Sequence, residues 1–153
     1  HLTNKIIFEA LKREKIKKFK NLENIFQEVK FGKNTRFDFL INKDKKKIFI
    51  EVKNVTLSRK KGTAEFPDAI TSRGLKHIKE LIKANKKGYE IFLLYLIQRD
   101  DCSKFKLAND IDPIYCEMLK KAVKKNLNLL CYDCKFSSKG IKLNREIKIK
   151  INE

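Results

Sequence analysis

The stretch RFDFLINKDKKKIFIEVKN, residues 36–54, decides the fold of this chain. Two apolar runs, 37–41 and 48–52, flank the polar segment NKDKK, a pattern typical of two strands joined by a hairpin turn. Because side chains alternate along a strand, Glu51 and Lys53 lie on one face of the second strand and Val52 lies on the other. A charged pair in a strand otherwise suited to burial has three explanations: a solvated edge, an internal ion pair or an active site.

Helical and strand patterns alternate along the rest of the chain. Apolar spacing predicts helices over residues 4–19, 71–88 and 110–126. Further strands are expected within 89–101, 127–137 and 141–151, and residues 22–32 are expected to form a short strand or an irregular approach to one. The order α, β, β, β, α, β, α, β, β predicts a single layered α/β domain over 1–153, with some parallel pairing in its sheet. The run YEIFLLYLIQRDD is the most apolar and should form a central strand covered on both faces.

Local signals mark the ends of two helices. In the second, Thr71 or Ser72 is the expected N-cap and Gly88 the expected stop. The third is expected to begin at Asp112, with Pro113 in the first helical position. The core stripe of the second helix is predicted as Leu75, Ile78, Leu81 and Ile82.

Two connections carry no helix or strand pattern. The segment LSRKKGT, residues 57–63, predicts a basic loop, and Pro67 excludes a regular central strand after it. Residues 100–113 are expected to form the longest irregular connection, which either borders a site or is an ordinary surface loop.

Composition limits the class of protein. A chain of 153 residues with 42% hydrophobic residues is long enough and apolar enough for one folded domain. No apolar run approaches membrane-spanning length and no secretory signal leads the chain, so we expect a cytoplasmic protein without a membrane partner. Because the chain opens on HLTNK without an initiator Met, we expect an N-terminal part to be missing.

The net charge is +18, from 37 Lys and Arg against 19 Asp and Glu. A field of this sign favours polyanions such as nucleic acid or an anionic membrane. AT-rich coding would also enrich Lys, Asn and Ile, but it accounts less well for the excess over acidic residues. We therefore favour nucleic acid as the partner.

Four cysteines, at 102, 116, 131 and 134, are expected to be reduced thiols. Cys131 and Cys134 form a C-x-x-C, yet the surrounding residues predict a strand, which places the two thiols on opposite faces. A zinc site is therefore not expected.

Asp38 changes the interpretation of Glu51 and Lys53. It lies in the strand before theirs, thirteen positions ahead of Glu51, and its aromatic neighbours make burial costly without a partner or a metal. A carboxylate on one strand and E-x-K on the next is the arrangement of PD-(D/E)xK nucleases. Two carboxylates suit Mg²⁺ or Mn²⁺, which would polarise a phosphate and activate a bound water. Lys53 would orient that water or stabilise negative charge.

Outer candidates have two interpretations each. Glu9 is either a further carboxylate near the metal or a solvated helix residue. Arg73 and His77 share a helix face that we expect to lie away from Leu75 and Ile78, and they either contact phosphates or belong to an ordinary polar face. Gln98, followed by Arg99, either lines the site or caps the sheet edge.

Five segments in order resemble the sugar fermentation stimulation protein family of bacteria and archaea: FGKNTRFDFLI, IFIEVKNVTL, AEFPDAITSRGLKHIKEL, FLLYLIQRDD and LANDIDPIY. The resemblance covers about residues 1–143. It implies a restriction-endonuclease-like fold, a mixed central sheet flanked by helices. It further implies sequence-nonspecific DNA binding and a possible role in regulating sugar (maltose) metabolism.

The same resemblance implies particular roles for residues. Asp38, Glu51 and Lys53 would form the nuclease-like triad, with Asp38 and Glu51 on the metal. Glu9 and Gln98 stay outer candidates on the reading of the residues alone. Asp68, Arg73 and His77 would line the same region. Arg59, Lys60 and Lys61, together with Arg73, are expected to contact the DNA backbone.

The sequence departs from the family in two respects. Phe37 stands where the motif name has Pro. An N-terminal OB-like domain, of a fold that binds single strands, is expected to be absent from this chain.

Overall fold

The computed structural model describes residues 2–151. Its main sheet has six strands in the order β1-β2-β3-β6-β8-β9. Their bounds are β1 (Asn24–Phe31), β2 (Thr35–Lys43), β3 (Lys46–Val55), β6 (Glu90–Ile97), β8 (Leu127–Ser137) and β9 (Gly140–Glu146). The central β6 pairs in parallel with β3 and β8, whereas the outer pairs are antiparallel. The predicted mixed central sheet and its buried central strand are thus confirmed.

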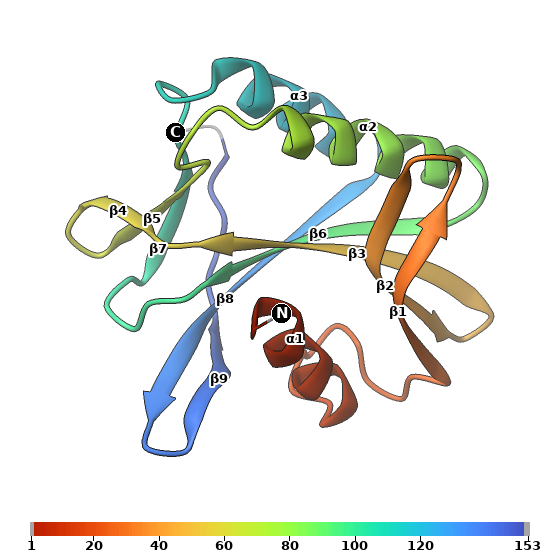
Figure 1. Cartoon of the computed structure of the whole chain (residues 1–153), viewed down its shortest axis with the longest axis horizontal. Coiled ribbons are helices and arrows are strands. Elements are labelled where there is room, and N and C mark those ends of the chain that lie inside the picture. The colour runs from red at the N-terminus through yellow and green to blue at the C-terminus, as the bar shows by residue number, and fades with distance from the viewer. Residues whose placement is uncertain (1, 152–153) are drawn as a thin grey trace.

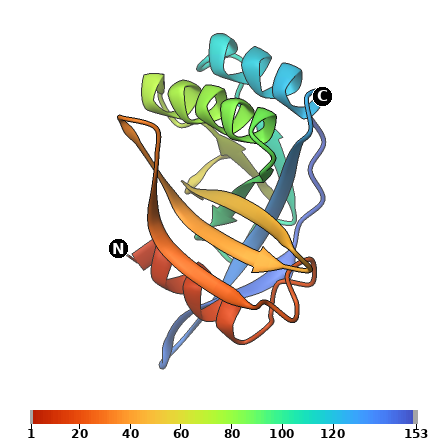
Figure 2. The same ribbon diagram turned by 90° about the vertical axis from the view of Figure 1, so that its right-hand side faces the viewer.

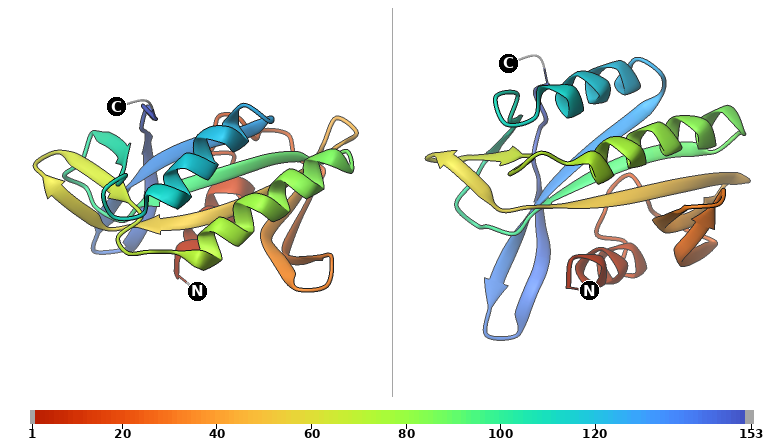
Figure 3. Two further views of the ribbon diagram at one scale, coloured as in Figure 1. Left: turned by 90° about the horizontal axis from the view of Figure 1, so that it is seen from above. Right: turned by 45° about the horizontal axis from the view of Figure 1, so that its top comes forward.

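Helices cover both faces of this sheet. Helices α2 (Ser72–Lys86) and α3 (Pro113–Val123) run side by side over one face, and α1 (Leu2–Lys12) lies against the other (Figures 1 and 3). The 90° view separates the three layers, with α1 and the paired helices on opposite sides of the strands (Figure 2). Two apolar clusters, one on each face, form the core. The restriction-endonuclease-like α/β class predicted from the resemblance is confirmed.

Turn and cap residues behave as their chemistry requires. The β2–β3 hairpin turns through Asp44 and Lys45, both with positive φ. The Thr71 hydroxyl accepts a hydrogen bond from Gly74 N at 2.9 Å and caps α2, and an Asp112 oxygen accepts from Tyr115 N at 3.0 Å and caps α3. These local predictions are confirmed.

Helix α1 is shorter than predicted, because it ends at Lys12 and not near Phe19. The amide of Lys15 donates to Ala10 O and that of Glu14 donates to Leu11 O, with Glu14 at φ 55°. This is a Schellman ending, which usually uses glycine and therefore gave no signal here. The apolar residues that follow, Ile16 and Phe19, lie in a segment without regular secondary structure, and both are buried.

The segment 57–107 contains a second sheet that the sequence did not reveal. Strands β4 (Leu57–Lys60), β5 (Thr63–Phe66) and β7 (Lys104–Leu107) pair in the order β4-β5-β7. The predicted basic loop is therefore a hairpin, and the predicted irregular connection contains a strand. Each strand has four residues, too few for a clear alternation, and β7 pairs in parallel with a distant β5.

The buried face of α2 is rotated from the predicted stripe. Ile78 and Leu81 are buried as expected, but Leu75 is half-buried, while Gly74 and His77 are buried. A side chain at Gly74 would come within 3.0 Å of the Tyr115 ring on α3. Gly74 and His77 lie three positions apart and share this buried face, so His77 does not lie on a face directed away from Ile78, as we had expected.

Cys131 and Cys134 belong to the two apolar clusters on opposite faces of the sheet, as predicted. All four cysteines are free and buried. No helix within residues 2–151 is both long enough and apolar enough to span a bilayer.

Candidate active site

Strands β2 and β3 bring two carboxyl groups together. The Val52 amide donates to Asp38 Oδ2 at 2.8 Å, and the Asp38 amide donates to Glu51 Oε1 at 3.2 Å. The two side chains thus hold each other's strand across the hairpin. Glu51 is buried, with 3% of its surface exposed, and Asp38 is half-buried.

Lys53 and His77 complete the cluster on the α2 side of the sheet. Glu51 Oε2 lies 2.7 Å from His77 Nδ1 and 3.6 Å from Lys53 Nζ. Lys53 Nζ lies 2.8 Å from the same ring nitrogen. Because Nδ1 either donates to the carboxylate or accepts from the amine, the tautomer of His77 decides which partner it binds. Glu51 and Lys53 share one strand face, as the period of two predicts.

Burial and charge separate the pKa values of the cluster. Burial, then the charge of Glu51, raises the pKa of Asp38 from 3.8 to about 7. Burial acts to raise the pKa of Glu51 too, but the His77 hydrogen bond and the charges of His77 and Lys53 outweigh it and lower that pKa. Burial lowers the pKa of Lys53 despite the nearby carboxylates. Opposed pKa values of neighbouring carboxyl groups are typical of sites that move protons or hold cations.

The first turn of α1 supplies two residues that sequence reasoning missed. Asn4 Nδ2 donates to Asp38 Oδ1 at 2.9 Å. Gln98 Nε2 donates to Thr3 Oγ1 at 2.8 Å, so the structure places Gln98 at the same helix end. The only signal was a pair of adjacent polar residues, Thr3 and Asn4, at the start of this amphipathic helix.

Glu9 is not brought to the cluster. It lies in a groove between α1 and β9, where its carboxylate pairs with Arg13 at 3.3 Å and with Lys12 at 4.0 Å. The interpretation of Glu9 as a helix-surface residue agrees with this position. Asp68 is exposed in the segment between β5 and α2.

The predicted backbone contacts fall in two places. Arg59 lies on β4 and binds the carboxylates of Glu65 and Asp110 at 2.6–2.9 Å. Lys60 and Lys61 are exposed at the β4–β5 turn.

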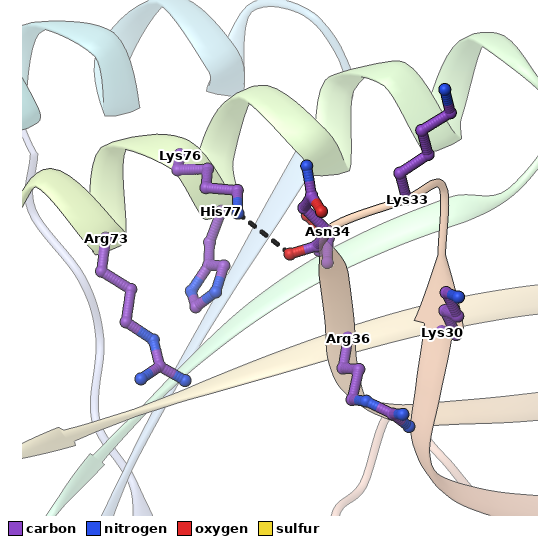
Figure 4. A pocket seen from close by; sticks show the side chains of 8 residues that line it. Lys30, Lys33, Asn34, Arg36, Arg73, Lys76 and His77 are labelled. Carbon is purple, nitrogen blue, oxygen red and sulfur yellow. Dashed lines mark hydrogen bonds between the residues drawn. The ribbon is translucent and has the colours of Figure 1, made fainter.

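Arg73 and His77 lie elsewhere, in a pocket of about 480 Å³ between α2 and the β1–β2 hairpin. Figure 4 shows both side chains descending from α2 toward the strands, opposite Arg36 on β2. His77 therefore belongs both to this pocket and to the cluster around Glu51.

The family described as "Sugar fermentation stimulation protein RE domain" matches residues 1–140. The chain belongs to this family. The sugar fermentation stimulation protein homolog of Pelagibacter ubique is 52% identical over 149 residues, and that of Clostridium acetobutylicum is 40% identical over 149 residues. Each alignment covers 97% of this chain and 64% of the relative, so the chain spans less than two thirds of their length.

A solved structure shares the fold of this family member. The structure titled "The structure of Pyrococcus Furiosus SfsA in complex with Ca2+" superposes with a TM-score of 0.88 at 29% identity. It covers 97% of this chain and 64% of that one. The fold of this chain is therefore that of a solved member of the family.

The donor set of this sugar fermentation stimulation domain fits a hard divalent cation. Asp38 and Glu51 keep acceptor capacity beyond the bonds they make, since a carboxylate has about four lone-pair sites. Two carboxylates held together under burial are unfavourable unless a proton or a cation lies between them. Within residues 2–151 no third His, Cys, Asp or Glu joins them in a metal-binding group, so water or a phosphate would complete the coordination.

Proposed function

We propose that this chain is the catalytic domain of a Mg²⁺- or Mn²⁺-dependent phosphodiesterase that hydrolyses DNA without sequence preference, in the cytoplasm. The observation that carries the proposal is the cluster of Asp38, Glu51 and Lys53, with His77 joining it to a basic pocket. A half-buried lysine beside two carboxylates is costly to maintain for stability alone.

The chemistry follows from the residue types. Asp38 and Glu51 would hold the cation, which supplies Lewis acidity toward the phosphate and toward bound water. The relative titled as a Ca²⁺ complex supports a divalent cation, because Ca²⁺ and Mg²⁺ share a preference for oxygen ligands. Lys53 has 13% of its side chain exposed, enough to reach a substrate while held close to Glu51. It would orient the attacking water or donate to the phosphate oxygens as charge develops.

A second candidate is a non-catalytic DNA-binding regulator of sugar (maltose) metabolism that keeps the nuclease scaffold. The internal pairing of Glu51 with His77 and Lys53 favours it, since each charge already has a partner within the protein. Sequence-nonspecific contacts by exposed basic residues would suffice for this role.

Cleavage assays on single- and double-stranded DNA, with Mg²⁺ or Mn²⁺, separate the two candidates. For the enzyme, Lys53→Ala and Lys53→Met should each lower the cleavage rate about 100-fold or more while DNA binding persists. Lys47→Ala is the matched control, because it removes an exposed charge from the same strand and should leave the rate unchanged.

Calorimetric titration with Mn²⁺ completes the test. Wild-type protein should bind the ion, and Glu51→Gln should not. If the protein binds DNA, cleaves no substrate and binds no ion, the result would favour the non-catalytic regulator and contradict the phosphodiesterase.

A further inference from the structure

The pocket between α2 and the β1–β2 hairpin is the most basic hollow beside the cluster. Five cationic side chains line it from two walls, with no carboxylate among the lining residues: Lys30, Lys33, Arg36, Arg73 and Lys76. Figure 4 shows Arg73 and Lys76 on α2 and Arg36, Lys30 and Lys33 on the hairpin, the two elements that form the walls. Like charges gathered in a concave surface focus a positive potential there.

These charges differ from the other arginines of the domain in having no acidic partner. Arg59, Arg99 and Arg145 each bind a carboxylate at 2.6–3.1 Å. Within residues 2–151, none of the five pocket cations forms an ion pair. In the part of the chain that the structure describes, Arg36 and Lys76 donate only to backbone oxygens, those of Glu28 at 3.4 Å and Asn34 at 2.9 Å. The pocket therefore carries unneutralised charge that an anion would satisfy.

Thr35 gives a second, independent indication of a ligand. It lines the pocket with only 4% of its surface exposed, and among the described residues 2–151 its Oγ1 finds no hydrogen-bond partner. A buried hydroxyl left unpaired is unfavourable for stability, so such groups normally have a partner. An oxyanion in the pocket would accept this hydrogen bond.

Contacts within the protein hold the two walls in place. Thr35 pairs with Phe31 at the hairpin end, and Gly32 takes the positive φ of 64° that the tight loop requires. Lys76 Nζ ties the loop to α2 through Asn34 O. A preformed pocket loses little free energy to ordering when an anion binds.

We propose that this pocket binds a phosphate group of a nucleic-acid strand and holds the strand beside Glu51 and Lys53. The proposal deepens the proposed function and rests on it for the identity of the strand. His77 is the shared wall, since it lines the pocket and contacts both Glu51 and Lys53. A phosphate in the pocket therefore places the neighbouring part of the same strand at the cluster.

Binding in EDTA tests the pocket separately from catalysis. Fluorescence anisotropy would compare oligonucleotides that carry a 5′-phosphate, a 3′-phosphate or hydroxyls at both ends, with inorganic phosphate as competitor. Arg36→Ala/Arg73→Ala removes one cation from each wall. Lys124→Ala/Lys125→Ala removes the same charge from two exposed lysines at the end of α3 and is the matched control.

The pocket variant should bind the oligonucleotides about 10-fold or more weakly than the control variant. A preference for one phosphorylated end, lost in the pocket variant, identifies a terminal phosphate. Equal pocket-dependent binding of all three identifies an internal backbone phosphate. Pocket and control variants that bind all strands alike overturn the proposal, even if inorganic phosphate still binds. If the wild-type protein cleaves no substrate while its DNA binding still depends on the pocket residues, the proposed nuclease activity is rejected and the proposed phosphate pocket is retained.

Thr35→Val gives a readout that a purely structural role would not. Removing an unpaired buried hydroxyl should leave the melting temperature unchanged or raise it, while inorganic phosphate should protect the variant less than wild type. If phosphate protects Thr35→Val as fully as it protects wild type, the Thr35 hydroxyl does not take part in binding the phosphate.

Discussion

Asp38 combines opposing demands in one side chain. Its carboxylate accepts hydrogen bonds from Val52 N and Asn4, which favour the charged form, yet burial and Glu51 raise its pKa to about 7. Between about pH 4 and 7 the folded protein holds a proton that the unfolded chain releases. The stability of the metal-free protein should therefore fall as the pH rises through this window.

Asp38→Asn should remove that dependence. The amide keeps an acceptor for Val52 N and stays neutral, so at pH 8 in EDTA the variant should be more stable by at most about 4 kcal/mol, at about 1.4 kcal/mol per pKa unit. Thermal melts of both proteins at pH 5 and pH 8 would measure the difference, which should shrink at pH 5. A variant less stable than wild type at pH 8 would contradict the unfavourable burial of this carboxylate.

Among single residues, Asp38, Glu51 and Lys53 could be predicted because their types and spacing are local facts. Their partners could not. Asn4 reaches Asp38 from a helix 34 positions earlier in the chain, and His77 reaches Lys53 from one 24 positions later. Neither distance is encoded in a sequence period.

Arg59 acts at the level of elements, because it joins β4, β5 and the segment before α3. Its guanidinium binds Glu65 and Asp110, and these bonds lower the pKa of Glu65 and lower that of Asp110 to about 2. The sequence predicted it to contact DNA, but its guanidinium already binds two carboxylates.

Arg59→Ala should therefore lower the melting temperature at pH 7 by several degrees, because the Glu65 side chain, 2% exposed, would lose its partner. A carboxyl group whose pKa is lowered by folding stabilises the folded state at any pH above the pKa that it has in the unfolded chain. This contribution is lost as the pH falls toward 2. The difference from wild type should thus narrow in acid. Lys60→Ala, the adjacent exposed control, should melt like wild type; an equal loss in both variants would exclude a specific role for the Arg59 bonds.

The elements that were predicted well are those with strong local patterns. The β2–β3 hairpin, β6 and the caps of α2 and α3 follow from alternation, an apolar run and capping residues. The predicted end of α1 was wrong, and the pairing of β5 with β7 was not predicted. The first depends on a non-glycine Schellman residue, and the second on contacts about 40 positions apart.

Charge belongs to the scale of the whole molecule. Lysines also line hollows at the β2–β3 turn and beside β7, so the net +18 is spread over several surfaces. We expect DNA affinity to fall steeply with salt, by about 10³-fold between roughly 50 and 200 mM if about six phosphates are contacted. Anisotropy titrations over this range would measure the slope, and binding that does not respond to salt would contradict contact with the DNA backbone.

The sequence alone determined the class of fold, the hairpin of Asp38 and Glu51, and the shared face of Glu51 and Lys53. The class of fold follows from the order of helix and strand patterns and from the family resemblance. The hairpin and the shared face follow from side-chain alternation and turn chemistry, which act over a few residues. The tertiary structure alone decided that His77 turns inward, that α1 supplies Asn4, and that unpaired cations meet Thr35 in one pocket. Those features arise where segments far apart in sequence pack together, and burial and charge there depend on the neighbours that packing provides.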